Sequence, residues 1–408
     1  MDEKVVVTGI GVITSVGMGK EEFWNSLICG KEGIKEITSF DTRKYKCRKG
    51  GEIERFTFPS YLKKADRSSQ LLATCVEEAI SDAKLDLDKE DKEMTGVVIG
   101  TALGGILSGE KIHFALKNNQ QRKIKSLFLE YPLHRSAEYI RDRFNLKGSI
   151  ITLSNACTSS SNAIGYAYNL IRYKRSEIMI VGGVDTLSQF VFSGFNSLRI
   201  LTEDKCRPFD KKRDGLVLGE GAGVIILERL HHALYRNAHI YAEIVGYSNS
   251  CDACHISAPD KESDGAYQAI KIALKEAKLK IKDIDYIHLH GNGTIYNDRM
   301  ESTAIKRAFG VYKEKIPVSA IKAMTGYTLG ASGVIDGITC ILIMNNNFIP
   351  PIINYATPDS ECNLNFVTNK GKKRKVKISL SLSSGFGGAN TVILFKKYSG
   401  RKHNNGKQ

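Results

Sequence analysis

Residues 154–165 read Ser-Asn-Ala-Cys-Thr-Ser-Ser-Ser-Asn-Ala-Ile-Gly, and they join an apolar, strand-like segment to a helical one. The strand-like segment covers residues 149–153. Beyond the cysteine, apolar residues recur at the spacing of one helix face, namely Ala163, Ile164, Ala167, Leu170 and Ile171. Because several of these residues are small, the helix is expected to pack closely inside a larger body. Cys157 is therefore predicted to lie where a strand ends and a buried helix begins.

A cysteine at such a junction has two interpretations. The unpaired N–H groups and the positive end of the dipole at a helix N-terminus favour a thiolate at Cys157. A buried structural cysteine is nevertheless the commoner fate of a free thiol. Cys157 is thus a candidate nucleophile only if the rest of the chain supplies a base and an oxyanion hole.

The composition indicates a globular protein with reduced thiols. The chain has 408 residues, of which 42% are hydrophobic, and this length suits roughly two to three domains or one large duplicated fold. No apolar run approaches the roughly 18 to 20 residues of a membrane span, and no secretory signal is visible at the N-terminus. The nine cysteines show no regular framework, which fits reduced thiols in the cytoplasm better than a disulfide scaffold.

The charge of the chain points to an acidic partner. The formal net charge is +15 and the sequence pI is about 9.2. The basic residues are dispersed and form no nucleic-acid motif, so we expect no nucleic-acid partner. An acidic protein partner explains the same charge equally well. Residues 398–408 are polar and basic, and are predicted to form a flexible tail.

A glycine-rich turn that feeds an apolar strand occurs twice, at residues 219–227 and 385–394. Each turn closes a run in which predicted strands alternate with predicted helices, an order typical of α/β layers around a buried sheet. We therefore predict an N-terminal half (1–235), with a charged, irregular insertion at about 105–147, and a C-terminal half (236–397). The patterns predict strands at 5–11, 96–99, 177–184 and 240–246, and helices at 22–27, 68–83 and 333–344.

Three polar turns downstream carry the other candidate functional residues. The first contains His288 and His290, which the period of two places on the same face of a strand. A metal pair would lack a third ligand at a recognisable spacing, so we expect no metal. A Cys–His nucleophile pair is the sharper alternative. The other two turns are residues 322–331 and 383–390, and the glycines of the latter would bring backbone N–H groups close to a ligand.

Residues 251–255 read Cys-Asp-Ala-Cys-His, which is the attachment pattern of a c-type haem. Patterns of about five residues arise readily by chance. Haem attachment normally requires an oxidising compartment, and no export signal is visible. We therefore expect neither haem nor any other resident cofactor.

Several motifs occur in a fixed order over most of the chain, at residues 155–159, 207–215, 219–228, 290–291, 322–330 and 385–390. From about residue 5 to residue 397, the chain resembles the elongating class of β-ketoacyl-[acyl-carrier-protein] synthases in the thiolase superfamily. The resemblance implies an α/β, thiolase-like duplicated α/β/α/β/α layered fold. It also implies an acyltransferase that extends chains by decarboxylative Claisen condensation, in fatty acid or in specialised lipid or polyketide synthesis.

The resemblance assigns roles to the matching residues. Cys157 corresponds to the nucleophile that takes the acyl chain from a carrier thioester. The backbone N–H groups of Cys157 and Phe386 correspond to its oxyanion hole, and Phe386 also corresponds to an aromatic gate at the acyl pocket. His290 corresponds to the first of two histidines that assist decarboxylation of the malonyl extender.

Further residues correspond to supporting positions. Lys322 matches a lysine buried beside the histidines, with Glu301 as its carboxylate partner and Asp298 as a nearby supporting acid. A purely structural ion pair is the alternative for Lys322 and Glu301. Thr294 matches a threonine near the phosphopantetheine arm, which arrives on the acyl carrier protein.

The chain departs from the family pattern around this site. Tyr327 stands where the family has its second histidine, Asn292 where it has a threonine, and Ser384 where it has an aromatic residue. Residues 131–139 also lack the usual Asn-Met motif, so the acyl tunnel and the dimer contact are expected to differ. A phenol donates one hydrogen bond, but with a pKa near ~10 it is a poor base at neutral pH. We therefore expect a specialised condensing enzyme with an altered extender site.

Acyl carrier proteins are acidic, and the resemblance offers six candidate docking residues: Lys63, Lys64, Arg67, Arg122, Lys123 and Arg207. A homodimer is expected, and a heterodimer remains open. Two other functions also remain open, namely a catalytically weak, chain-length-factor-like partner subunit and an acyltransferase or thioesterase without efficient decarboxylation. Cys157, His290 and Lys322 argue for the condensing enzyme, whereas Tyr327 and Ser384 argue for the partner subunit.

Overall fold

The computed structural model describes residues 3–120 and 124–400. Two of the candidate docking residues, Arg122 and Lys123, lie outside the described residues. Most of the predicted basic tail lies outside them as well.

One mixed sheet of 11 strands runs through the described chain, and its two halves have the same order. From the outer edge inwards, the N-terminal half runs β6-β5-β7-β8-β1 and the C-terminal half runs β11-β10-β14-β15-β9. The two central strands pair antiparallel where Val5–Val7 meets Ala242–Ile244. The bounds are β1 (Val5–Thr14), β5 (Thr95–Gly100), β6 (Ile150–Leu153), β7 (Ile178–Asp185), β8 (Gly221–Arg229), β9 (Ala242–Cys251), β10 (Tyr286–His288), β11 (Val318–Ser319), β14 (Ile378–Gly385) and β15 (Ala389–Lys397).

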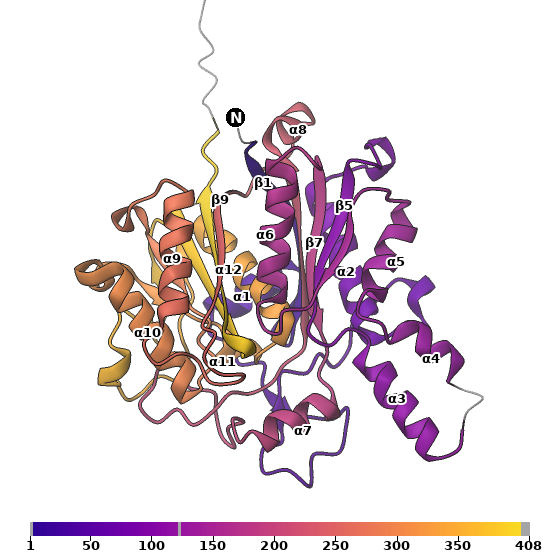
Figure 1. Ribbon diagram of the computed structural model, residues 1–408, viewed down its shortest axis with the longest axis horizontal. Coiled ribbons are helices and arrows are strands. Elements are labelled where there is room, and N and C mark those ends of the chain that lie inside the picture. Colours follow the sequence, from indigo (N-terminus) through magenta and orange to yellow (C-terminus); the bar gives the residue numbers. More distant parts are fainter. Residues whose placement is uncertain (1–2, 121–123, 401–408) are drawn as a thin grey trace, which may run out of the picture.

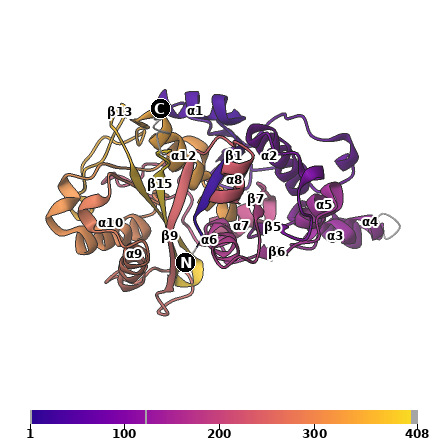
Figure 2. The ribbon, with the colours of Figure 1, turned by 90° about the horizontal axis from the view of Figure 1, so that it is seen from above.

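The helices form three layers around the two half-sheets (Figures 1 and 2). In the centre lie α6 (Ser159–Arg172) and α12 (Ser332–Asn346). The outer face of the N-terminal half is covered by α2 (Arg67–Ala83) and α5 (Arg135–Phe144), and that of the C-terminal half by α9 (Asp264–Glu276) and α10 (Ile295–Phe309). The predicted duplicated α/β/α/β/α fold is therefore confirmed.

Shorter elements connect these layers. The helices among them are α1 (Lys20–Ile28), α3 (Ile106–Lys117), α4 (Lys125–Glu130), α7 (Gln189–Ser197), α8 (Leu230–Tyr235) and α11 (Lys322–Thr325). The short strands are β2 (Gly17–Met18), β3 (Lys35–Glu36), β4 (Lys49–Gly50), β12 (Phe348–Ile349) and β13 (Lys372–Lys373).

The central helices can be buried because most of their side chains are small or apolar. Every residue of α12 from Ser332 to Met344 is buried. Leu329–Asn346 even has the length and hydropathy of a membrane span, yet 89% of it is buried inside the structure. The expectation that no such stretch exists is therefore wrong. The burial of this stretch is that of a core helix packed between two sheets.

The described part of the insertion near residues 105–147 is helical, not irregular as predicted. It contains α3, α4 and α5. Its many charges conceal a short apolar face, because Ile112, Ala137 and Ile140 are buried while most of the charged residues face outward. Charge density alone was thus a poor guide to the absence of secondary structure here.

A buried carboxylate joins β1, β8 and α8. Glu228 accepts hydrogen bonds from Thr8, Arg236 and His232, and the other ring nitrogen of His232 lies 2.9 Å from Glu90. Burial works to raise the pKa of Glu228, but these hydrogen bonds lower it to about 2. The hydrogen bond to Glu228 raises the pKa of His232 above its usual value, against the effect of burial.

Replacing His232 by Gln is expected to cost more stability under acidic than under alkaline conditions. A raised folded-state pKa stabilises the fold fully below the unfolded value of about 6.5, and this stabilisation is lost as the pH rises through the folded value. The difference in unfolding free energy between parent and variant should therefore shrink by about 1 kcal/mol between pH ~6 and pH ~9, which urea unfolding at each pH measures. The matched control is His231→Gln, at an exposed neighbouring position. An equal loss at both pH values would contradict the assignment.

Candidate active site

The predicted junction at Cys157 is confirmed: β6 ends at Leu153 and α6 begins at Ser159. Local hydrogen bonds shape the turn between them. The Asn155 N–H donates to the Ser159 hydroxyl at 2.9 Å, and the Thr158 hydroxyl donates to the Asn155 carbonyl at 2.9 Å. Ala156 has φ 49°, a left-handed conformation that is uncommon for a residue with a side chain. The turn thereby presents Cys157 towards the interior, with 7% of its surface exposed.

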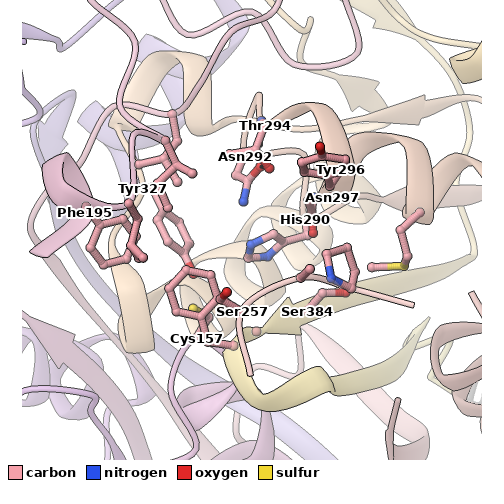
Figure 3. Close-up of a pocket in the computed structure, with 18 of the residues that line it drawn as sticks. Cys157, Phe195, Ser257, His290, Asn292, Thr294, Tyr296, Asn297, Tyr327 and Ser384 are labelled. Carbon is pink, nitrogen blue, oxygen red and sulfur yellow. Dashed lines mark hydrogen bonds between the residues drawn. The ribbon is translucent and has the colours of Figure 1, made fainter. Parts of the chain in front are cut away.

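Side chains from both halves of the chain meet Cys157 in one cavity of about 250 Å³ (Figure 3). Among the sequence-predicted residues, those that line it are Cys157, His290, Asn292, Thr294, Tyr327, Ser384 and Phe386. Phe195, which the sequence reasoning missed, also lines it and stacks on Phe386 with ring centroids 5.7 Å apart. Phe195 lies on α7, in a segment without any motif, so no sequence signal marked it.

The thiol of Cys157 is surrounded by hydrogen-bond donors. Burial raises its pKa above the usual value, and hydrogen bonds from the Tyr327 hydroxyl and the backbone N–H groups of Phe386 and Cys157 oppose that shift. Burial prevails, so the net pKa of the thiol is raised, against the direction expected from the helix N-terminus. The two backbone N–H groups lie beside the sulfur, which is where the carbonyl oxygen of a thioester attacked by this thiol would also lie.

His290 follows β10 and is held through its backbone. Its N–H donates to one oxygen of Glu301 at 2.6 Å, and the N–H of Gly291 donates to the other at 2.7 Å. Burial, reinforced by the nearby Lys322 cation, lowers the pKa of His290 well below its usual value. The imidazole is therefore neutral at neutral pH. It meets Tyr327 edge to face at 5.3 Å between ring centroids, and its Nδ1 is buried without a protein partner.

Lys322 is paired with Asp336, not with Glu301 as predicted. Its ammonium lies 2.7 Å from one oxygen of Asp336, and His288 Nε2 lies 3.2 Å from the other. Glu301 is instead occupied by the two backbone N–H groups, and burial raises its pKa to about 8. Asp336 was missed because it is distant in sequence. Its signal was that it is the only charged residue of the apolar helix α12.

The two histidines of the His288–His290 pair have different surroundings. His288 bonds to the Tyr286 hydroxyl and to Asp336, whereas His290 lines the cavity. Among the described residues, no three His, Cys, Asp or Glu side chains come together as a metal site.

The remaining polar residues organise the rim of the cavity. Asn292 accepts hydrogen bonds from the N–H and the hydroxyl of Thr294, both at 2.9 Å, and its amide nitrogen points into the cavity (Figure 3). Asp298 accepts from the N–H of Phe209 at 2.7 Å and of Gly293 at 3.3 Å. Asp298 is thus a support for the loop that carries these residues. The hydroxyl of Ser384 donates to Asn390 at 3.0 Å.

A second, mainly apolar cavity of about 560 Å³ also reaches Cys157, from the side of α7. Its lining includes Ala102, Leu103, Val191, Leu198 and Leu329. The Cys157 thiol thus lies between the cavity that contains His290 and a second, apolar cavity.

The candidate docking residues differ in their surroundings. Lys63 and Lys64 are exposed. Arg67 is unsuited to docking, because its guanidinium is held by Glu220 at 2.6 Å and by the Ile53 carbonyl. Arg207 is partly buried and paired with Asp204 at 2.5 Å.

Comparison with known proteins identifies one family. The model for the beta-ketoacyl synthase N-terminal domain matches residues 2–233, and that for the C-terminal domain matches residues 241–356. Among curated relatives, 3-oxoacyl-[acyl-carrier-protein] synthase 2 of Synechocystis sp. is 38% identical, over 97% of this chain and 98% of its own.

Solved structures share the whole fold. The ishigamide ketosynthase/chain length factor superposes with a TM-score of 0.93 at 32% identity, over 98% of this chain and 100% of its own. A type II polyketide ketosynthase, bound to a hexaketide and in complex with its acyl carrier protein, superposes with a TM-score of 0.92 at 31% identity. The match covers 98% of this chain and 100% of the ketosynthase chain. The chain belongs to the β-ketoacyl synthase family.

Proposed function

We propose that the protein is a condensing enzyme that joins an acyl chain on Cys157 to malonyl carried by an acyl carrier protein. The sulfur of Cys157 attacks the acyl thioester and releases the carrier thiol. Malonyl then loses carbon dioxide, and the resulting enolate attacks the acyl-enzyme carbonyl. The β-ketoacyl carrier is released and the thiol is regenerated. The observation that carries the proposal is the convergence of the thiol, two backbone N–H donors and His290 on one cavity.

Each group has a part in stabilising developing negative charge. The N–H groups of Cys157 and Phe386 receive the oxyanion formed when the thioester is attacked. His290, neutral because its pKa is lowered by burial, donates a hydrogen bond to the enolate oxygen. The ion pair with Asp336 fixes the Lys322 cation near His290. The positive charge of Lys322 disfavours protonation of the imidazole and so helps to keep His290 neutral.

Tyr327 gives the proposed extender site its distinctive character. Burial raises the pKa of its phenol well above the usual value, and the adjacent Cys157 reinforces the shift. The group is thus a neutral donor at all ordinary pH values. Its hydroxyl hydrogen-bonds to the Cys157 sulfur, so it serves the nucleophile, and the enolate is left with His290 and the amide of Asn292 as donors.

Tyr327→His is expected to accelerate decarboxylation of malonyl carrier by up to about 10²–10³-fold, which is the effect of one oxyanion donor on the rate. Intact-mass analysis of the carriers measures decarboxylation, and that of the enzyme measures acylation of Cys157. Tyr327→Phe removes only the hydroxyl, and should slow acylation more than decarboxylation. Cys157→Ala is the control that abolishes acylation. If Tyr327→His is no faster than the parent in decarboxylation, Tyr327 does not limit that step.

An exposed apolar surface near the active site is suited to binding a second subunit. Phe114, Phe128 and Phe190 are 51%, 54% and 67% exposed, and form an aromatic face on α3, α4 and α7. A cavity beneath this face shares Phe190 and Ser193 with the apolar cavity at Cys157. A partner that covers the aromatic face would therefore enclose the acyl chain. We propose a second copy of this chain as that partner.

Phe114→Asp is expected to convert the dimer to a monomer, because a carboxylate buried in an apolar interface is unpaired. Native mass spectrometry of the chain expressed alone measures the oligomeric state. Tyr235→Asp, at an 84% exposed aromatic residue on α8, is the control and should stay dimeric. A parent that is monomeric alone, but dimerises with a related ketosynthase chain, would favour the chain-length-factor-like partner function, as would a parent that is never acylated on Cys157.

The proposed carrier is an acidic protein, and Lys63 and Lys64 are the exposed candidates to meet it. Charge reversal of both to Glu is expected to raise KM for the acyl carrier roughly tenfold at low salt. The effect should shrink as the Debye length falls to about 8 Å near physiological ionic strength. Steady-state kinetics at two salt concentrations measure it. The control is Lys282→Glu, at an exposed lysine of the C-terminal half. An unchanged KM would remove both lysines from the docking surface.

The reaction as proposed needs no resident cofactor, because the phosphopantetheine thioester arrives with the carrier. We also propose a cytoplasmic location. All nine cysteines are free, which fits a reducing compartment.

A further inference from the structure

The Cys-Asp-Ala-Cys-His segment wraps around the turn that carries Phe386. That turn is the 3₁₀ segment Phe386–Gly388, and Gly387 within it has φ 80°. The N–H of Gly387 donates to the Ile256 carbonyl at 2.7 Å, and its own carbonyl accepts from the Cys251 thiol at 3.3 Å. Both backbone polar groups of Gly387 are thus held by the loop that contains the two cysteines.

Neighbouring contacts make this a rigid connection. The N–H of Asp252 donates to the Gly388 carbonyl at 2.8 Å, and the Asn390 amide donates to Asp252 at 2.7 Å. A side chain at Gly388 would come within 2.9 Å of Asp252 Cβ, so the two backbones are in close contact. The same loop supplies Ser257 and Pro259 to the lining of the active-site cavity.

Cys251 and Cys254 differ in accessibility from most of the other cysteines. Of the nine free cysteines, only Cys29, Cys251 and Cys254 are exposed. Two residues separate Cys251 from Cys254, and one of them, Ala253, has φ 51°, which bends the chain between the two thiols. The condensation chemistry uses neither thiol.

We propose that Cys251 and Cys254 form a reversible thiol–disulfide site that controls the position of Phe386. A hydroperoxide oxidises one thiol to a sulfenic acid and is itself reduced to an alcohol or water. The second thiol attacks the sulfenic sulfur, forming the S–S bond and releasing water. The two sulfurs supply the two electrons that break the O–O bond. A thiol reductant reverses the reaction by disulfide exchange.

The disulfide acts on the catalytic thiol through Gly387. Bond formation removes the S–H donor from the Gly387 carbonyl. It also draws Cys254 towards the end of β9, and with it the following Ile256 carbonyl that holds the Gly387 N–H. Phe386 immediately precedes Gly387, its N–H bonds to the Cys157 sulfur, and its ring stacks on Phe195. Oxidation therefore weakens the donor set around Cys157 and slows its reactions.

The test compares reduced and oxidised full-length protein. The protein is treated with hydrogen peroxide, and peptide mapping identifies a Cys251–Cys254 link and confirms that Cys157 is still reduced. The rate at which iodoacetamide alkylates Cys157 is then measured by mass spectrometry. We expect alkylation to slow about fivefold on oxidation, the effect of losing one hydrogen bond, and to recover with dithiothreitol. This readout needs no condensation activity, so it stands apart from the proposed function.

Two variants separate this effect from direct oxidation of Cys157. Cys254→Ser should alkylate at the parent's reduced rate and be insensitive to peroxide. Cys29→Ser, which removes the other exposed thiol, should respond as the parent does. The proposal is overturned if no Cys251–Cys254 link forms, if the link leaves the alkylation rate unchanged, or if Cys254→Ser slows as much as the parent.

Discussion

The contact between α6 and α12 is the constraint on which the rest of the structure depends. A side chain at Gly333 would come within 2.6 Å of the Ser161 backbone nitrogen, and the N–H of Val334 donates to the Ser160 hydroxyl at 2.9 Å. The two central helices therefore touch through their first turns. Because each helix lies against the sheet of its own half, this contact also fixes the distance between the half-sheets. Cys157 directly precedes one of these helices and Tyr327 lies shortly before the other, so the contact that closes the fold also assembles the site.

Burial determines which side chains of the candidate active site are neutral. It is the largest cause of the pKa shifts at Cys157, Tyr327 and His290, and in each case it favours the neutral form. Lys322 and Asp336 form an ion pair in which both side chains are buried. In such surroundings hydrogen bonds are electrostatically stronger than in water. Neutral donors that are already oriented can thus stabilise an oxyanion without first releasing water.

The local features of the fold could be predicted from the sequence, and the long-range ones could not. Strand and helix around Cys157 follow from apolar periodicity, and the repeated glycine turns revealed the two halves. The partner of Lys322 is 14 positions further along the chain, and a helix of buried residues gives no periodicity that points to Asp336. Arg67 looks like a surface cation in the sequence, and only the fold brings Glu220 to it. The helices of the charged insertion were not predicted, because its many charged residues outnumber the few apolar side chains that are buried against the rest of the protein.

Tyr327 contributes to the first step of the proposed reaction. While Cys157 is a free thiol, the phenol donates to the sulfur and opposes the rise in its pKa. Once the sulfur is acylated, it becomes a thioester and is a much weaker acceptor, so this hydrogen bond belongs to the first step of the proposed reaction. The proposed enolate of the second step then relies on His290 and the amide of Asn292, which line the same cavity. In the proposed reaction the hydroxyl of Tyr327 thus assists acylation, and the polar residues around His290 assist decarboxylation.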